Sequence, residues 1–279
     1  MQLIQWALQA LHGLELSEGA IIGALHRVAA VGQVTVDQMR ATMRASPRVS
    51  ADETGLREDG ANGYLWSFST ERERYFVRGP RTKAMVDAVL GPDFAGVLVT
   101  DFYAAYDHYH GPHQRCWAQL LRDIHDLTDK HPKDAALQTW AIAVHGVYER
   151  ACRAQLGPPA HRPAARRQGE ADLLALCQPY LAADAAAAVP QAALCRRIQK
   201  YLPELFTFVV DPALSSTNNA AERSVRPVVC QRKISGRTRS PEGTRTFTTL
   251  ASLFGTWRAR GLDPLVACRA VLTQAAASV

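Results

Sequence analysis

The chain has 279 residues, of which 47% are hydrophobic and 21% charged, so it can bury the core of one elaborated domain or of two smaller ones. This composition is that of a globular protein. The N-terminal stretch MQLIQWALQALHGLEL lacks a basic leader followed by an unbroken apolar segment, and no run of about 18 apolar residues follows it. We therefore expect an intracellular protein without a membrane span.

The six cysteines lie far apart and form no Cys-x-x-Cys pair, which predicts reduced and mostly buried thiols. The net charge is +6, and residues 223–279 carry ten Lys or Arg against two acids, so the positive excess is C-terminal. Most of it belongs to what we call the basic cluster: Arg223, Arg226, Arg232, Lys233, Arg237, Arg239 and Arg245. Such a cluster is typical either of a solvated loop or of a contact with the phosphate backbone of nucleic acid, and composition alone leaves both open.

Residues 1–47 show helical spacing of apolar groups, with Gly13 ending a first helix and Ser17 as the N-cap of a second. Two helices joined by a glycine are compatible with a helix-turn-helix and with plain packing. From residue 48 onward, RVSADETGLR, GYLWSFSTE and RYFVRGP predict three antiparallel strands. Turn signals at Asp59-Gly60 and at Asn62-Gly63 separate the first two.

The next stretch, TKAMVDAVLG, predicts a helix that Gly91 ends, and FAGVLVTD predicts a strand buried on both faces. A strand that follows a helix in this order usually lies parallel to its partner, and here we expect it beside the first strand. Residues 117–210 predict an almost wholly helical insertion. The helix with Glu222 follows, then the basic cluster, then a helical tail from about Thr246.

Three acids stand at informative positions in this plan. Asp52 lies in the first strand and Asp101 closes the parallel one, so neighbouring strands would bring the two carboxylates together. Each has a simpler explanation, because Asp52 suits a polar turn and Asp101 suits a strand end. A β-β-β-α-β order with acids on its first and fourth strands is the plan of the ribonuclease H-like fold, which completes a metal site with an acid from a later helix. Glu222 opens such a helix.

Local helix chemistry offers another explanation of Glu222. If Asn219 is the N-cap, Glu222 stands three residues later, at the spacing of a capping box. Glu222 also precedes Arg226 by four residues, where an exposed ion pair would contribute about 0.3 to 0.5 kcal/mol.

Three stretches carry a family resemblance: ADETG, GPDFAGVLVTDFYAAYDHYHGPHQRCWAQLLRD and TNNAAERSVRPVVCQRKISG. In this order, from about residue 48 to the C-terminus, they resemble the transposases of the insertion sequence 66 family. The resemblance implies a catalytic triad of Asp52, Asp101 and Glu222 on a ribonuclease H-like core. It divides the chain into a helical lead-in (1–47), a core (48–116 and 211–245), a helical insertion (117–210) and a C-terminal helical tail (246–279).

The resemblance also implies cofactors and partners. Two Mg²⁺ or Mn²⁺ ions, about 3.5 to 4 Å apart, would activate the attacking oxygen and stabilise the leaving one, with the three acids as ligands. The partner is double-stranded DNA, at the element ends and at the target, and the basic cluster would bind it. A homodimer, accessory element-encoded proteins and a cytoplasmic, nucleoid-associated location belong to the same expectation, with no membrane contact.

Two departures from the family pattern stand out. Members usually carry a longer N-terminal region with a DNA-binding module and a cysteine-rich zinc motif, and this chain begins after it, which indicates a truncated copy. Gln119 stands where the family more often has a histidine.

Other sites and functions stay open. His113 and Cys116 have the spacing of zinc ligands, although no second pair accompanies them. The alternatives to a transposase are a ribonuclease H-like nuclease or resolvase without strand transfer, and a DNA-binding remnant that no longer cuts. The intact acids argue against the remnant.

Overall fold

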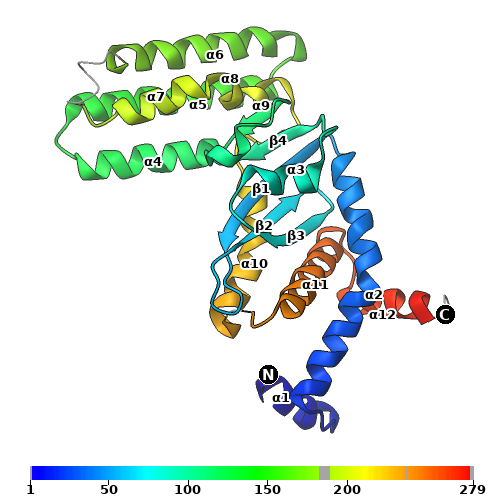
Figure 1. Ribbon diagram of the computed structural model, residues 1–279. Helices are drawn as coiled ribbons and strands as arrows, with labels where there is room; N and C mark the ends of the chain where they lie inside the picture. Colours follow the sequence, from blue (N-terminus) through cyan, green and yellow to red (C-terminus); the bar gives the residue numbers. More distant parts are fainter. Residues whose placement is uncertain (1, 182–188, 237, 277–279) are drawn as a thin grey trace. The chain divides into compact units, whose positions relative to one another are not determined.

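The computed structural model of the protein describes residues 2–181, 189–236 and 238–276, and it is a mixed α/β structure that is mostly helical (Figure 1). The strands are β1 (Arg48–Gly55), β2 (Tyr64–Ser69), β3 (Arg74–Gly79), β4 (Val97–Thr100) and β5 (His113–Arg115). The α-helices are α1 (Gln2–His12), α2 (Glu18–Arg44), α3 (Lys83–Leu90), α4 (Trp117–Lys130), α5 (Ala135–Leu156), α6 (Arg162–Cys177), α7 (Ala192–Lys200), α8 (Leu202–Leu205), α9 (Thr207–Val210), α10 (Asn219–Ser235), α11 (Pro241–Ala259) and α12 (Pro264–Ala276).

The strands form one sheet in the order β3-β2-β1-β4-β5. β2 and β3 are antiparallel, whereas β4 runs parallel to β1 on one side and to β5 on the other. In the β1–β4 register, Ser50 lies opposite Val99. The predicted strands, the helix before β4 and the parallel placement of β4 beside β1 are confirmed. β5 was not predicted, because its residues His, Gln and Arg lack the apolar pattern of a strand.

Backbone geometry confirms a predicted turn and a predicted helix end. Asp59 and Gly60 have φ values of 44° and 82°, and Glu58 and Ala61 exchange backbone hydrogen bonds across them. This geometry is that of the tight turn that Asp-Gly favours between strands. Gly91, with φ 81°, ends α3 and donates its N–H to the Asp87 carbonyl.

The chain divides into two compact units. The first comprises residues 1–46, 52–93 and 223–279, and the second comprises residues 47–51 and 94–222. Two elements pass from one unit to the other: β1 does so after Ala51, and α10 does so after Glu222.

In the first unit, α11 packs on β3 and α2 packs on α11. Phe76 in β3 donates its N–H to the Ser252 hydroxyl at 2.9 Å, and Arg74 donates its N–H to the Thr256 hydroxyl at 2.8 Å. β3 is an edge strand, and these helix hydroxyls satisfy backbone donors that the sheet leaves unpaired. Ser17 accepts a hydrogen bond from the Ala20 N–H, so its predicted role as the N-cap of α2 is confirmed.

The helix α2 is also unusually apolar for its length. Among the described helices it alone is long and apolar enough by composition to cross a membrane, with a mean hydropathy of 1.3 over 18 residues. One such helix near an N-terminus is weak evidence of a span, because packed helices pass the same test. Here the Gln33 side chain accepts a hydrogen bond from the Thr249 hydroxyl, so α2 is packed against α11.

The second unit holds the helices α4 to α9, which pack together around one hydrophobic core. Trp117 is fully buried there, with its ring centroid 5.6 Å from that of Phe206. The buried Gln114 of β5 accepts a hydrogen bond from the Phe208 N–H at 2.8 Å, which ties the sheet edge to α9. The described residues of the segment 117–210 are therefore largely helical, as predicted.

Three predicted boundaries need correction or restriction. Most of the basic segment belongs to α10, which continues to Ser235 despite Pro227 inside it. α11 begins at Pro241 rather than near Thr246, because Ser240 caps it by accepting from the Gly243 N–H. Of the alanine-rich stretch before α7, residues 182–188 lie outside the described residues.

Candidate active site and nucleic-acid interface

The start of α10 is anchored inside the second unit by Asn218. Its side-chain amide donates to the Ala51 carbonyl of β1 at 2.8 Å, and its backbone N–H donates to the Cys116 sulfur at 3.2 Å. Trp117, the first residue of α4, donates its N–H to the Ser216 carbonyl at 3.0 Å. Asn218 is only 2% exposed, and its side-chain oxygen has no hydrogen-bond partner in the structure described. The segment that leads into Glu222 is therefore attached to the strand that carries Asp52.

The hydrogen-bond register of α10 overturns the capping-box hypothesis for Glu222. The Glu222 N–H donates to the Asn218 carbonyl at 3.1 Å, so Asn218 is the N-cap and Glu222 is the fourth helical residue after it. A capping box needs the third. The ion-pair partner of Glu222 in the described chain is Arg122 of α4, at 4.0 Å, rather than Arg226. The Glu222 side chain is 42% exposed and so is open to solvent.

Asp52 and Asp101 hold comparable places on neighbouring strands. Asp52 lies in β1 and Asp101 directly follows β4, and both are half-buried. One carboxylate oxygen of Asp52 accepts the Glu53 N–H at 2.9 Å, and one of Asp101 accepts the Tyr103 N–H at 2.9 Å. The hydrogen bond to Asp101 fixes the chain as it turns away from the sheet.

The carboxylates are suitable ligands in kind for a hard divalent cation. Within the described ranges, however, no three His, Cys, Asp or Glu side chains stand close enough together to hold a metal ion. The zinc alternative for His113 and Cys116 has no support either. The His113 ring lies 2.8 Å from the Thr100 hydroxyl, and burial raises the pKa of the Cys116 thiol, which disfavours the thiolate that zinc binds.

A buried arginine that the sequence analysis missed secures the end of β4. Arg115 is fully buried, and it donates to the Asp101 carbonyl at 2.9 Å, to Asp107 at 2.7 Å and to Glu204 at 2.6 Å. Its guanidinium also lies 4.3 Å from the ring centroid of Tyr201. Every direction of the guanidinium fork is therefore used within the second unit, and Asp101 is held by its backbone.

The groups around Arg115 have shifted pKa values that agree with this arrangement. Burial opposes ionisation of Asp107, but hydrogen bonds from Lys200 and Tyr201 and the charge of Arg115 lower the pKa of Asp107 below its usual value. Burial, with a smaller contribution from Arg115, lowers the pKa of His113 well below its usual range. The carboxylate of Glu204 lies 3.3 Å from the His113 ring and would act in the opposite direction, yet burial outweighs it because the ring is almost wholly removed from water.

The basic cluster occupies two helices of the first unit. Arg223, Arg226, Arg232 and Lys233 lie on α10, Arg239 precedes α11, Arg245 lies on α11, and Arg237 falls outside the described residues. All the described members are exposed except Arg232, which is half-buried and donates to the Thr54 hydroxyl at 3.2 Å. Among described side chains, no carboxylate forms an ion pair with any of them. The described members of the cluster are thus cations that the described part of the chain does not neutralise.

Comparison with known proteins identifies the family. The profile of the "Transposase IS66 family" matches residues 4–246. Two similar proteins of Sinorhizobium fredii (strain NBRC 101917 / NGR234) are "Uncharacterized protein y4qI", 24% identical over 94% of this chain and 54% of that protein, and "Uncharacterized protein y4jD", 27% identical over 91% of this chain and 55% of that protein. The chain therefore spans about half the length of the curated relatives that it matches. Because the profile covers most of the chain, the protein belongs to the IS66 transposase family.

Proposed function

We propose that this chain cuts and joins DNA in the transposition of an insertion sequence, with Asp52, Asp101 and Glu222 as its catalytic triad on a ribonuclease H-like core. The sheet order β3-β2-β1-β4-β5 supports this, since β2 and β3 are antiparallel and β4 and β5 continue the sheet parallel to β1. Membership of a transposase family supports the reaction class.

The observation that carries the triad is the β1–β4 register. Ser50 lies opposite Val99, and continuing both strands by two residues reaches Asp52 on one and Asp101 on the other. Adjacent parallel strands lie about 4.8 Å apart, so this register is the one that a site shared by the two acids requires. Asn218 links the third acid to β1. Its side chain is hydrogen-bonded to Ala51, the residue before Asp52, and it directly precedes α10, the helix that carries Glu222.

Mg²⁺ is the cofactor that this donor set would take, with Asp52, Asp101 and Glu222 as its ligands. When bound, the metal would activate the attacking oxygen and stabilise the charge on the leaving one. Proteins commonly hold Mg²⁺ with one or two carboxylates and the phosphates of the substrate. Since no three such ligands are gathered among the described side chains, the proposal requires substrate phosphates to complete the ligand set.

The reaction itself has two phosphoryl transfers. Water attacks the phosphodiester at the end of the element, and the bond to the 3′-oxygen breaks to leave a 3′-hydroxyl. That hydroxyl then attacks a phosphodiester of the target DNA, and a new bond joins element and target while a target 3′-hydroxyl leaves. In both transfers, Arg115 and Asn218 act as positioning residues, because they hold the backbone next to Asp101 and Asp52 and do not touch the substrate.

DNA recognition falls to the basic cluster in this proposal. Phosphate contacts fix the position of a protein on DNA and carry no sequence information by themselves. The exposed members without carboxylate partners suit that role. The proposed partners are therefore the ends of the element and the target duplex, together with a second copy of the chain and accessory proteins of the element, in the cytoplasm.

The test is a nicking and joining assay with Mg²⁺ on the purified protein and its Asp52→Asn, Asp101→Asn and Glu222→Gln variants. Each change keeps the shape of the side chain and removes the charge that a hard cation needs. We expect cleavage and joining to fall by about a hundredfold or more in each variant, with the melting temperature near wild type. The matched controls are Glu149→Gln and Asp93→Asn, which neutralise exposed acids and should keep activity.

Two results would contradict parts of the proposal. Full cleavage by Glu222→Gln with an unchanged melt would remove Glu222 from the triad. Triad-dependent nicks without joined products would favour the nuclease or resolvase alternative.

A further inference from the structure

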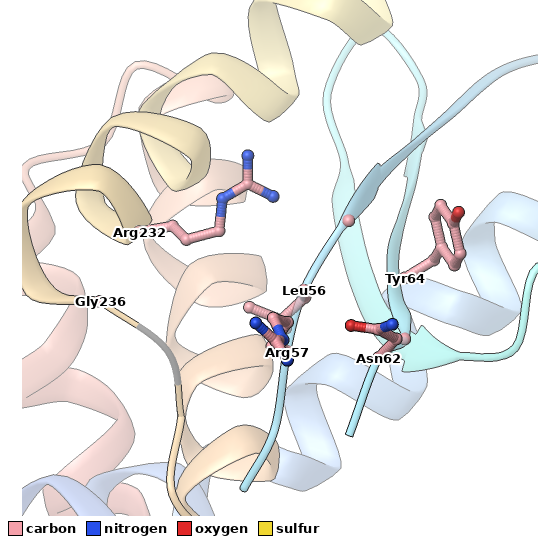
Figure 2. Close-up of a pocket in the computed structure, with 8 residues that line it drawn as sticks. Leu56, Arg57, Asn62, Tyr64, Arg232 and Gly236 are labelled. Atoms are coloured by element: carbon pink, nitrogen blue, oxygen red, sulfur yellow. The ribbon is translucent and has the colours of Figure 1, made fainter. Parts of the chain in front are cut away.

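A pocket of about 620 Å³ lies within the first unit, beside the end of β1 (Figure 2). Its wall is formed by the β1–β2 connection and by the C-terminal part of α10, and it includes Gly55, Leu56, Arg57, Asn62, Tyr64 and Arg232. The volume is within the range of about 300 to 1,000 Å³ that small-molecule sites occupy.

The cations at this pocket have hydrogen bonds but no carboxylate partner in the described chain. Arg57 donates to the Gly60 carbonyl at 3.2 Å, and Arg232 donates to the Thr54 hydroxyl at 3.2 Å. Two acids near the pocket are paired with other cations, since Glu58 lies 3.4 Å from Arg78 and Glu53 lies 2.7 Å from Arg81. Two guanidinium groups with spare donors at one pocket suit a phosphate group, which they recognise with fork geometry.

The other walls suit a nucleobase. The Tyr64 ring has one face near Arg81, whose guanidinium lies 5.2 Å from the ring centroid. The exposed Asn62 amide has no hydrogen-bond partner within the described residues, and an amide offers both donors and an acceptor to a base edge. Aromatic surfaces beside a positively charged groove are the usual means of holding an unpaired base.

Gly55 leaves the pocket open at the end of β1. A Cβ atom built on Gly55 meets no other atom within 4 Å, and its backbone has no positive φ. Gly55 also lies three residues after Asp52 on the same strand, which is a separation of about 10 Å. The pocket is therefore close along β1 to the proposed cleavage site.

From these observations we infer that the pocket binds one unpaired nucleotide of a DNA strand, with its phosphate at Arg57 and Arg232 and its base between Tyr64 and Asn62. The inference rests on the proposed function, because it supplies a site for the strand end that cleavage frees. Duplex DNA cannot fill the pocket unless a nucleotide leaves the stack, so the site distinguishes single strands from duplexes.

The experiment compares binding of a fluorescein-labelled single strand of about 12 nucleotides with that of its blunt duplex, by anisotropy at one salt concentration. The variants of the full chain are Gly55→Val, which adds a side chain at the pocket without changing charge, and Asn62→Ala. We expect Gly55→Val to weaken single-strand binding about tenfold or more, and duplex binding much less. Asn62→Ala, at an exposed position, should show a smaller loss in the same direction.

The double variant Arg57→Gln/Arg232→Gln has a matched control in Arg239→Gln/Arg245→Gln, which also removes two positive charges but outside the pocket. The control should weaken both DNA forms alike, whereas the pocket variant should weaken the single strand more. If the melting temperature of Gly55→Val is below that of the wild type, its binding is not interpreted, and the Asn62→Ala variant alone tests the contact with the base.

Several outcomes overturn the inference: no single-strand binding by the wild type, or variants that bind the single strand as the wild type does. Equal losses for strand and duplex in the pocket variants would also overturn it. The nicking assay on the same preparations separates this failure from that of the proposed function. If nicking depends on the triad but Gly55→Val binds the single strand as the wild type does, only the pocket inference is rejected. If the pocket variants selectively lose single-strand binding but the wild type does not nick DNA, only the proposed function is rejected.

Discussion

Arg115 in the second unit and the basic cluster in the first unit are cations in opposite surroundings. In the second, Arg115 is fully buried and meets Asp107, Glu204 and the Asp101 carbonyl. In the first, the described members of the basic cluster are exposed or half-buried, and none has a carboxylate partner in the described chain. An arginine that the chain neutralises itself serves the fold, whereas one that it leaves without an anion is available to a phosphate. Burial and pairing, not residue type, separate structural cations from those suited to binding.

The first prediction tests the structural side of this comparison. Arg115→Met keeps much of the side-chain volume but leaves Asp107 and Glu204 without their buried cation. We expect the free energy of unfolding to fall by about 3 to 5 kcal/mol, as when one partner of a buried ion pair is removed. Urea unfolding measures it, and Arg223→Met is the control, with an expected change within about 0.5 kcal/mol. Equal effects at the two positions would erase the distinction between a buried, paired arginine and an exposed one.

The second prediction concerns Asn218, which joins β1 to the start of α10. Asn218→Ala removes the donor to the Ala51 carbonyl and should cost about 1 to 3 kcal/mol of unfolding free energy. Activity should fall with it, because the entry of α10 positions Glu222. The neighbouring Asn219→Ala is the control and should unfold near wild type. Unchanged stability and nicking in Asn218→Ala would show that this hydrogen bond does not position the helix.

A third prediction follows from the lowered pKa of His113. The unfolded histidine titrates near 6.5 and the folded one well below it, so the unfolded state binds more protons. The stabilising effect is therefore complete above about pH 6.5 and is lost as the pH falls below it, by at most about 1.4 kcal/mol per pH unit.

Unfolding curves between about pH 7 and 5 measure this slope, which His113→Gln should reduce. The exposed His131→Gln should leave it unchanged. Glu204 and Arg115, which face His113, stay in both proteins. A slope that His113→Gln does not alter would assign the pH dependence to other groups.

Substitutions in the basic cluster should have the smallest effect on stability, but they should change the salt dependence of DNA binding. Each change to Ala at Arg232, Lys233, Arg239 or Arg245 should alter the free energy of unfolding by no more than about 0.5 kcal/mol. If these side chains contact phosphates, each should lower the slope of log affinity against log salt by about one, with little change in sequence preference. Anisotropy titrations at several salt concentrations measure this slope.

The matched control for the cluster removes exposed cations of the second unit. They are Lys130, Lys133, Arg153 and Arg167. Changing them to Ala alters the net charge by nearly the same amount, yet the salt slope should stay at the wild-type value. A slope that responds equally to both sets would indicate a response to net charge alone.

The sequence predicted the parts of the fold that depend on neighbours along the chain. Strands β1 to β4, the Asp59-Gly60 turn and the end of α3 at Gly91 all follow from residue patterns over a few positions. The wrong assignments also have a local cause. Asn219 and Asn218 are equally good caps by residue type, and only the hydrogen bond from Glu222 decides between them.

The sequence by itself determined which chemical groups are present and on which elements they lie: acids on β1, after β4 and in α10, and cations from Arg223 onward. Only the tertiary structure decided which of them meet. Asn218 reaches Ala51 across 167 positions, and Arg115 reaches Glu204 across 89. Such pairings leave no local pattern, because a buried polar group is satisfied by whatever the packed chain brings to it. The same packing buried Arg115 and left Arg57 and Arg232 beside an open pocket.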